Sequence, residues 1–349
     1  MQKITIIGWS DWFWKWLASF ILENFRENIE LTITWRNETK LKKVWEQLKC
    51  KYTIKTREVI VDSDITIFAV PIAYTTKIIE MYAPYLKLWS TVLDVTSIKK
   101  WPSESLKKFS PKWVLIIPTH PMFGPFISSI AGQIFVLCPL EKEDKNDFRY
   151  KFLKDFLEKS WAKVVEETAE EHDKMMAVVQ GLTHFNMFVL ANTMKNLNFD
   201  IKKSFDFISP IYKIMISSVW RYVWQNPKLY ADIQMNNTEV LKVHKEFMKS
   251  TEKFNKFVEE KDEDSFINNI EQSEKYFWDN AKSGQKYTDK IIFLLWKQIE
   301  KAEKSIWKEI ILENIYDKKI IKSVLVKYED RKLYLENWKT LELDVWNII

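Results

Sequence analysis

With 349 residues, the chain is too long for one small core, and its length predicts two domains with a further appendage. Its 46% hydrophobic and 29% charged residues are typical of an ordinary globular protein, and no apolar run approaches the roughly 18 residues that span a bilayer. The mild net charge of +5 favours small anionic ligands over nucleic acid. Two cysteines are too few for a disulfide framework, and Met1 leads straight into a short strand instead of a signal peptide, so we expect a cytoplasmic protein.

Glycine and tryptophan usage is abnormal, with 17 Trp and only 5 Gly. At ordinary usage of about 7%, roughly 24 glycines are expected. The tryptophans also stand where glycine is typical: Asn337-Trp338, for example, separates two alternating runs where Asn-Gly would form a hairpin. One hypothesis is that the gene comes from an organism that reads UGA as glycine, and the alternative is a genuinely tryptophan-rich protein. Because indoles do not fit tight turns, the first hypothesis is favoured.

The first turn of the chain carries a nucleotide-binding pattern. An apolar strand at residues 3–7 is followed by Gly8-Trp9-Ser10-Asp11-Trp12-Phe13-Trp14 and by a helical run at residues 17–25. With glycine at positions 9, 12 and 14, this becomes a turn in which backbone amides and a helix N-terminus approach a pyrophosphate. As written, three indoles would block that approach.

The second strand, at residues 31–34, ends in Trp35-Arg36-Asn37 and not in an acidic residue. An acid at this position binds the ribose hydroxyls of NAD, whereas an arginine can bind the 2′-phosphate of NADP. The pattern therefore favours NADP, with a solvated loop cation as the alternative for Arg36.

Strands and helices continue to alternate, which predicts a parallel sheet covered on both faces. A buried strand at residues 64–70 is closed by Pro71, and the strand at residues 91–95 is followed by Thr96-Ser97-Ile98-Lys99. Ligands of such sheets bind beyond the carboxyl ends of the strands, so Ser97 and Lys99 are either ligand-facing or ordinary turn residues.

His120 follows the apolar strand at residues 114–117, which brings it to the same edge of the sheet. We expect it on a turn stiffened by Pro118 and Pro121. A histidine held in this way suits proton transfer, although a turn-capping role is the alternative.

From Ala169 the pattern becomes helical. His184 either faces a cleft or packs between helices, and Arg221, in a mostly apolar helix, needs a carboxylate or an anionic ligand as its partner. Residues 250–300 read as amphipathic helix suited to a dimer interface, and alternating runs after residue 304 predict a small β appendage. The predicted domains are 1–168, 169–303 and 304–349.

Several separated motifs together resemble the prephenate dehydrogenase family, in its archaeal-like branch, from Lys3 to about Lys297. The motifs are residues 6–18 with glycines restored, 94–99, 118–125, 171–173, 180–185 and 209–235. The resemblance implies a Rossmann-type domain followed by an all-helical dimerisation domain, a homodimer, and NAD or NADP as cofactor. It also implies oxidative decarboxylation of prephenate to 4-hydroxyphenylpyruvate and CO₂ in tyrosine biosynthesis. Arogenate dehydrogenase remains open, as does a non-catalytic dimeric binding protein if the tryptophans are genuine.

The resemblance also assigns roles to residues. His120 would take the proton of the ring hydroxyl, Ser97 would hold that hydroxyl and the imidazole in register, and Arg221 would clamp a substrate carboxylate. His184, Thr183 and Gln225 would complete the substrate pocket, and no metal is needed. The residues expected at the cofactor are Gly8, Trp9, Ser10, Asp11, Trp12, Phe13, Trp14, Arg36, Val70 and Pro71.

Overall fold

The structure is a computed structural model that describes residues 1–8, 13–124, 127, 129–316, 318–329 and 331–349, with only the backbone described at residue 279. It divides into two compact units, one of residues 1–125 and 129–248 and the other of residues 126–128 and 249–349. The three-part division at residues 168 and 303 stays a prediction.

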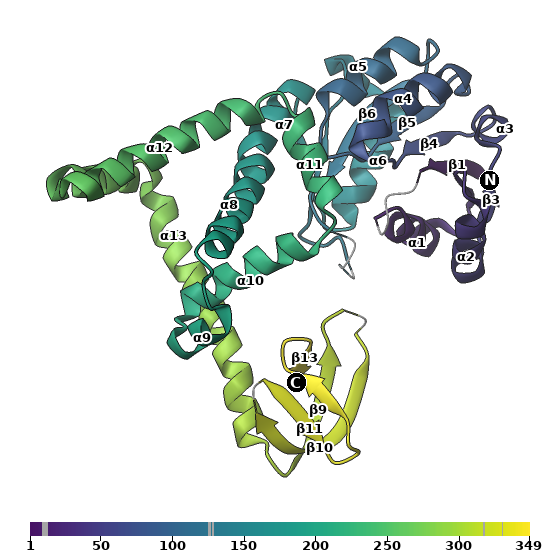
Figure 1. Ribbon diagram of the computed structural model, residues 1–349. Coiled ribbons are helices and arrows are strands. Elements are labelled where there is room, and N and C mark those ends of the chain that lie inside the picture. The colour runs from purple at the N-terminus through teal and green to yellow at the C-terminus, as the bar shows by residue number, and fades with distance from the viewer. Residues whose placement is uncertain (9–12, 125–126, 128, 317, 330) are drawn as a thin grey trace. The chain divides into compact units, whose positions relative to one another are not determined.

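The first unit contains an eight-stranded sheet in the order β3-β2-β1-β4-β5-β6-β7-β8 (Figure 1). Neighbours from β3 to β6 are parallel, β7 runs antiparallel to β6, and β8 runs parallel to β7. The order of the first six strands is that of a dinucleotide-binding Rossmann sheet, so the predicted fold class is confirmed. The strands are β1 (Gln2–Ile7), β2 (Ile29–Thr34), β3 (Lys51–Thr53), β4 (Ile65–Phe68), β5 (Thr91–Asp94), β6 (Leu115–Pro121), β7 (Ile134–Leu137) and β8 (Lys163–Glu166).

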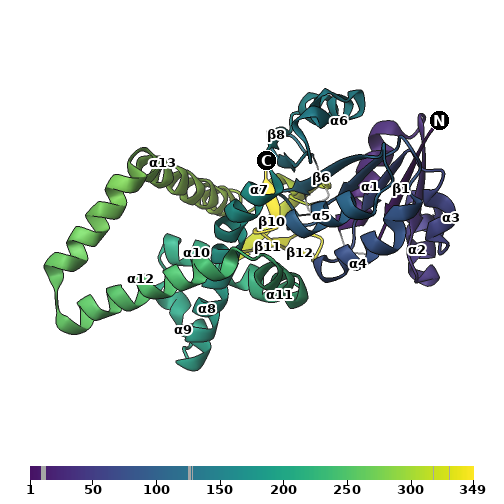
Figure 2. The same ribbon diagram turned by 90° about the horizontal axis from the view of Figure 1, so that it is seen from above.

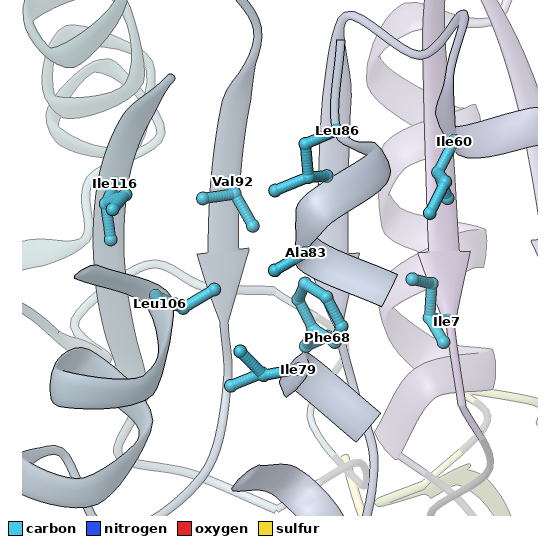
Figure 3. Close-up of a cluster of buried hydrophobic side chains, with 9 residues drawn as sticks. All are labelled: Ile7, Ile60, Phe68, Ile79, Ala83, Leu86, Val92, Leu106 and Ile116. Atoms are coloured by element: carbon cyan, nitrogen blue, oxygen red, sulfur yellow. The ribbon is translucent and has the colours of Figure 1, made fainter. Parts of the chain in front are cut away.

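Helices cover both faces of this sheet. On one face, α4 (Ile72–Tyr82) and α5 (Lys100–Phe109) pack onto the strands through the cluster of buried side chains in Figure 3. At about 1.5–3 kcal/mol for each large apolar side chain, this burial strongly stabilises the layer. On the other face lie α1 (Phe13–Phe25) and α6 (Phe148–Lys159). The shorter helices of this part are α2 (Glu38–Leu48), α3 (Thr56–Ile60), η1 (Ala83–Tyr85) and η2 (Lys142–Asn146).

Helices follow the sheet, as expected. Thr168 caps α7 and Ser209 caps α10 by accepting backbone N–H groups, which starts each helix at a defined residue. Helix α10 packs against α8, and α11 packs against α4, so the helical segment returns to the sheet (Figure 2). The elements are α7 (Ala169–Met176), a π-helical turn η3 (Ala177–Leu182), α8 (Thr183–Asn196), α9 (Ile201–Ser204), η4 (Phe205–Phe207), α10 (Pro210–Trp224), α11 (Pro227–Asn236) and α12 (Val240–Glu260).

The second unit holds the long helix α13 (Glu263–Lys304), interrupted at Trp278, and a five-stranded antiparallel sheet in the order β12-β11-β10-β9-β13. Its core combines Leu312, Leu325 and Leu333 with Ala302 of α13. The β appendage is thus confirmed. Its strands are β9 (Lys308–Asn314), β10 (Ile320–Glu329), β11 (Lys332–Leu335), β12 (Thr340–Glu342) and β13 (Trp346–Ile348). Within the described residues, every helix is too short or too polar to cross a membrane.

Candidate active site

Because β1, β4, β5 and β6 are parallel, their carboxyl ends meet at one edge of the sheet. This is the edge where open α/β sheets bind ligands. Gly8 follows β1, Val70 follows β4, Asp94 ends β5, and His120 lies near the end of β6. The predicted convergence of these segments is therefore present.

His120 does not lie on a turn, and that prediction was wrong. It is part of β6 and pairs with Val136 of the antiparallel strand β7. The apolar run stops at Ile117, but Pro118 continues the strand because its carbonyl accepts a hydrogen bond from the backbone N–H of Cys138, at 2.8 Å. A proline lacks only the backbone N–H. This loss is tolerated here because Pro118 stands where the pairing of β6 with β7 begins.

A buried ion pair lies beside this histidine. The side chains of Lys99 and Asp94 are both fully buried, and the Lys99 ammonium donates to Asp94 Oδ2 and, at 2.6 Å, to the carbonyl of Thr119. Thr96 Oγ1 donates to the same carboxylate oxygen at 2.6 Å. A buried lysine is costly unless it is paired and hydrogen-bonded in this way. Lys99 therefore ties the loop after β5 to the backbone just before His120.

His120 is hydrogen-bonded to a second histidine from the helical segment. Its Nδ1 lies 2.9 Å from His172 Nε2, and His172 Nδ1 lies 2.8 Å from Asp173 Oδ1. The same carboxylate accepts the backbone N–H groups of Lys99 at 2.8 Å and Lys100 at 3.0 Å. Asp173 thus holds α7 against the N-terminus of α5. A chain of hydrogen bonds runs from Asp173 through His172 to the imidazole of His120.

Burial keeps both imidazoles neutral near pH 7. Desolvation holds the pKa of His120 well below its ordinary value, and a positive charge on His172, if that ring were protonated, or on Lys99 lowers it further. Desolvation also lowers the pKa of His172, although its hydrogen bond to Asp173 acts in the opposite direction. A neutral imidazole can accept a proton, which is the state that a general base requires.

The π-helical turn η3 faces the other nitrogen of His120. Gln180 Nε2 lies 3.4 Å from His120 Nε2, and Gln180 Oε1 is buried without a hydrogen-bond partner in the described part of the chain. Gln234 donates to the carbonyl of Gly181 at 2.9 Å, which fixes the turn against α11. Single π-helical turns occur often at functional sites. Gln180 Oε1 and His120 Nε2 are therefore polar atoms to which a ligand can hydrogen-bond.

Ser97 lies half-buried in the loop after β5, between Asp94 and Lys99. Among the described residues no hydrogen bond joins it to His120. Its proposed contact with the imidazole stays a prediction.

Several other residues predicted to bind the substrate lie around a tyrosine of α11. His184 is 8% exposed, and its ring centroid lies 4.8 Å from that of Tyr230 and 4.9 Å from that of Tyr222. The Tyr230 hydroxyl donates to Gln225 Oε1 at 2.5 Å.

Arg221 lies near the same tyrosine. Burial raises the pKa of Tyr230 to about 12, and the positive charge of Arg221 acts in the opposite direction. Arg221 and Thr183 are exposed. No carboxylate pairs with Arg221 within the described residues, so its charge is available to an anionic ligand.

At the nucleotide end of the edge, Gly8 has φ +124°, and a Cβ there would lie 2.5 Å from both the Ala69 carbonyl oxygen and Val70 Cγ1. Only glycine fits this position, which suits the close backbone approach of a dinucleotide turn. The predicted residues Trp9, Ser10, Asp11 and Trp12 lie outside the described residues.

The remaining predicted cofactor residues flank this glycine. Phe13 and Trp14 open α1, with Trp14 buried, and Pro71 follows the buried Val70 at the N-terminus of α4. Arg36 is exposed, with its guanidinium 5.6 Å from the centroid of the Trp35 ring. The loop after β2, which carries Arg36, and the loop after β4, which carries Pro71, both lie at the carboxyl edge of the sheet.

Sequence reasoning missed the roles of Lys99, His172, Asp173, Gln180 and Tyr230. All five lay inside motifs that the sequence singled out, but nothing local showed which side chains they contact. Among the described residues, no cluster of His, Cys, Asp and Glu side chains is arranged to hold a metal ion.

Comparison with known proteins agrees with this geometry. Residues 24–166 match the model of the prephenate dehydrogenase nucleotide-binding domain, and residues 168–272 match that of the prephenate dehydrogenase dimerization domain. The crystal structure of prephenate dehydrogenase from A. aeolicus, in complex with hydroxyphenyl propionate and NAD+, has a TM-score of 0.64 at 20% identity and covers 80% of this chain and 98% of that one. At that identity the structural likeness shows the fold alone.

Two relatives in sequence extend the comparison. The chain is 30% identical over 224 residues to the T-protein of Haemophilus influenzae, covering 64% of this chain and 58% of that protein. It is 38% identical over 346 residues to the probable arogenate/prephenate dehydrogenase of Methanocaldococcus jannaschii, covering 99% of this chain and 77% of that protein. On that similarity, the chain belongs to the prephenate dehydrogenase family of oxidoreductases.

Proposed function

We propose that this dehydrogenase oxidatively decarboxylates prephenate to 4-hydroxyphenylpyruvate and CO₂, with NADP or NAD as hydride acceptor. The observation that carries the proposal is the buried neutral His120, whose Nε2 points away from its hydrogen bond to His172 and can accept the proton of the ring hydroxyl. A bound nicotinamide would accept the hydride that leaves the ring carbon bearing this hydroxyl. Loss of CO₂ makes the ring aromatic and renders the step effectively irreversible.

The substrate carboxylates are assigned to the aromatic cluster around Tyr230. Arg221 offers a planar guanidinium that can bind a carboxylate through two parallel hydrogen bonds. The ring of His184 would line the pocket, with Gln225 held by Tyr230 and Thr183 at the start of α8. Ser97 would hold the ring hydroxyl against His120. These residues align the substrate, which is most of the task when the chemistry is intrinsically favourable.

We also propose that glycine stands at the tryptophan positions of the natural protein. Among the described residues, ten non-glycine residues have positive φ, and five of these are tryptophans, with φ between 62° and 72°. This left-handed region favours glycine and is disfavoured for a bulky side chain. The five residues are Trp89, Trp113, Trp161, Trp307 and Trp338, and all are more than 60% exposed.

The first helix supports the same substitution at position 14. The third glycine of a dinucleotide-binding turn allows close packing between helix and strand. In this chain the bulky side chain of Trp14 is buried on α1 at the position of that glycine. Glycine at this position would let the helix approach the strands and open the turn to a pyrophosphate.

The homodimer is assigned to the helical segment. A groove of about 650 Å³ between α8, α9 and α10 is lined mostly by apolar side chains, among them Phe188, Phe199 and Val223. The match to a dimerization domain supports a second copy of this chain as the partner of that region. Sedimentation of the purified chain tests this assignment, since a monomer at micromolar concentration would contradict it.

The activity is tested with the chain carrying glycine at Trp9, Trp12, Trp14, Trp35, Trp220 and Trp224. Prephenate and arogenate are each supplied with NADP and with NAD, and both the reduced cofactor and the aromatic product are measured. We expect turnover of prephenate, with NADP preferred because Arg36 follows β2 where an acid would favour NAD. Turnover of arogenate alone would change the substrate, and turnover of neither by a folded chain would overturn the proposal.

A further inference from the structure

We infer that His172 and Asp173 form a hydrogen-bonded relay that positions His120 and selects the tautomer in which its Nε2 is the proton acceptor. The inference rests on the proposed function for its chemical purpose, but the relay is a property of the protein alone. It assigns a role to His172 and Asp173 of the motif at residues 171–173, which the reaction itself leaves unexplained.

The order of donors follows from the carboxylate. Asp173 accepts from the backbone N–H groups of Lys99 and Lys100, which can only donate, and its Oδ1 also lies 2.8 Å from His172 Nδ1. An ionised carboxylate only accepts hydrogen bonds, so the hydrogen of a neutral His172 is on Nδ1. His172 Nε2 is then an acceptor.

The same logic passes to His120. Because its Nδ1 lies 2.9 Å from the acceptor His172 Nε2, the hydrogen of His120 must be on Nδ1. The lone pair of a neutral His120 is therefore on Nε2, where the Gln180 amide nitrogen lies 3.4 Å away and can act as donor. A substrate hydroxyl in that position would meet a base that is already in the required tautomer.

The relay also responds to the charge that proton transfer creates. When His120 takes a proton on Nε2, its Nδ1–H still donates to His172, and Asp173 supplies the negative charge at the far end. The opposite arrangement is inactive: a proton on His172 Nε2 would make His172 the donor and move the hydrogen of His120 to Nε2.

The charged and titratable groups that surround the pair come from several elements. Asp173 neighbours His172 on α7, Asp94 approaches from the end of β5, and Lys99 approaches from the loop that follows. Cys138, after β7, lies near Lys99, Asp94 and Asp173 and is uncharged at neutral pH because burial raises the pKa of its thiol to about 12. The opposite charges of the buried Lys99–Asp94 pair cancel each other. Among these groups, the two histidines are therefore the ones whose protonation changes.

The tautomers are measurable without substrate. The chain contains four histidines, so nitrogen–hydrogen correlation spectra of ¹⁵N-labelled imidazoles resolve each ring once His120→Asn, His184→Phe and His244→Phe assign three signals and leave the fourth to His172. We expect both His120 and His172 of the full chain to carry hydrogen on Nδ1 at neutral pH. Hydrogen on Nε2 of His120 would overturn the relay, whatever the enzyme turns over.

Kinetics of the glycine-restored chain add a second readout. His172→Phe removes the acceptor and should lower kcat by about 10²-fold, move the acid limb of the kcat profile to lower pH and leave KM for prephenate nearly unchanged. His172→Gln offers an amide oxygen to His120 Nδ1 and should recover part of kcat. The control His244→Phe changes a histidine that stacks on Phe185 and should leave the profile as it is.

The outcomes separate the two proposals. The expected tautomers in a chain that turns over neither prephenate nor arogenate would keep the relay and reject the proposed function. Normal kcat and an unchanged pH profile in His172→Phe, in a chain that does turn over prephenate, would reject the relay and keep the function. A loss of folding in His172→Phe leaves the tautomer measurement on the unmodified chain as the deciding result.

Discussion

Two sites at the same edge of the sheet differ in whether the side chains of this chain are sufficient to form them. At the ends of β5 and β6, Lys99, Asp94, His172 and Asp173 form hydrogen bonds that hold His120 in place without any ligand. At the ends of β1 and β4, Gly8 has the backbone of a nucleotide turn, but the sequence beside it carries three indoles. On the proposed function, the chain itself completes the site of proton transfer, whereas cofactor binding requires glycine in place of the three indoles.

The largest expected effect is on cofactor binding. Glycine at Trp9, Trp12 and Trp14 should strengthen NADP binding by at least about 10²-fold, since two charge-assisted hydrogen bonds from backbone amides are worth about 1.5–3 kcal/mol each. The matched control places glycine at Trp161, Trp307 and Trp338, outside the turn, and should leave binding unchanged. Calorimetric titration measures both, and equal affinity in the two triple variants would contradict the comparison.

The next effect concerns the exposed cation at the substrate cluster. Arg221→Ala should raise KM for prephenate by roughly 10- to 100-fold with a smaller effect on kcat, because a charge-assisted contact to a carboxylate is lost. Arg221→Lys keeps the charge but loses the planar guanidinium, so its KM for prephenate should lie between those of the parent chain and Arg221→Ala. An unchanged KM in steady-state assays of Arg221→Ala would remove this residue from the carboxylate site.

A smaller effect is the dependence of stability on pH. Burial lowers the pKa of His184 to about 4, so the unfolded chain binds more protons than the folded chain between that value and its ordinary 6.5. The stability contribution is complete above pH 6.5 and is lost as the pH falls toward 4. His184→Phe keeps the aromatic contacts with Tyr230 and should reduce the loss between about pH 7 and about pH 5 by roughly 2 kcal/mol in denaturant titrations. An equal pH dependence in both chains would show that His184 is solvated.

The smallest effect separates backbone strain from indole exposure. Trp338 has φ 62° and is 97% exposed, so its side chain packs on almost nothing. Trp338→Gly should be more stable than Trp338→Ala by about 1 kcal/mol, because only glycine adopts this conformation freely. Equal thermal unfolding of the two variants would mean that the left-handed conformation does not require glycine.

Much of the fold was accessible from the sequence because its signals are local. Alternating apolar strands and helices predicted the Rossmann-type sheet, and residues 323–328 predicted part of the C-terminal sheet. The partners of His120 were not accessible in this way. His172 lies 52 residues further along the chain and reaches His120 only because Asp173 anchors α7 on the N-terminus of α5.

Prolines misled the prediction for a related reason. Pro118 and Pro121 read as the start of a turn, yet β7 pairs with residues 119–121 and extends the strand through His120. Pairing across a sheet is a non-local property, and a local breaker does not decide it.

The most direct test of the account is turnover of prephenate by the glycine-restored chain with and without His120→Asn, at saturating cofactor. If His120 is the proton acceptor, kcat should fall by at least about 10²-fold while the affinity for NADP stays the same. Wild-type turnover in the His120→Asn chain would contradict the central claim and remove the histidine from the chemistry.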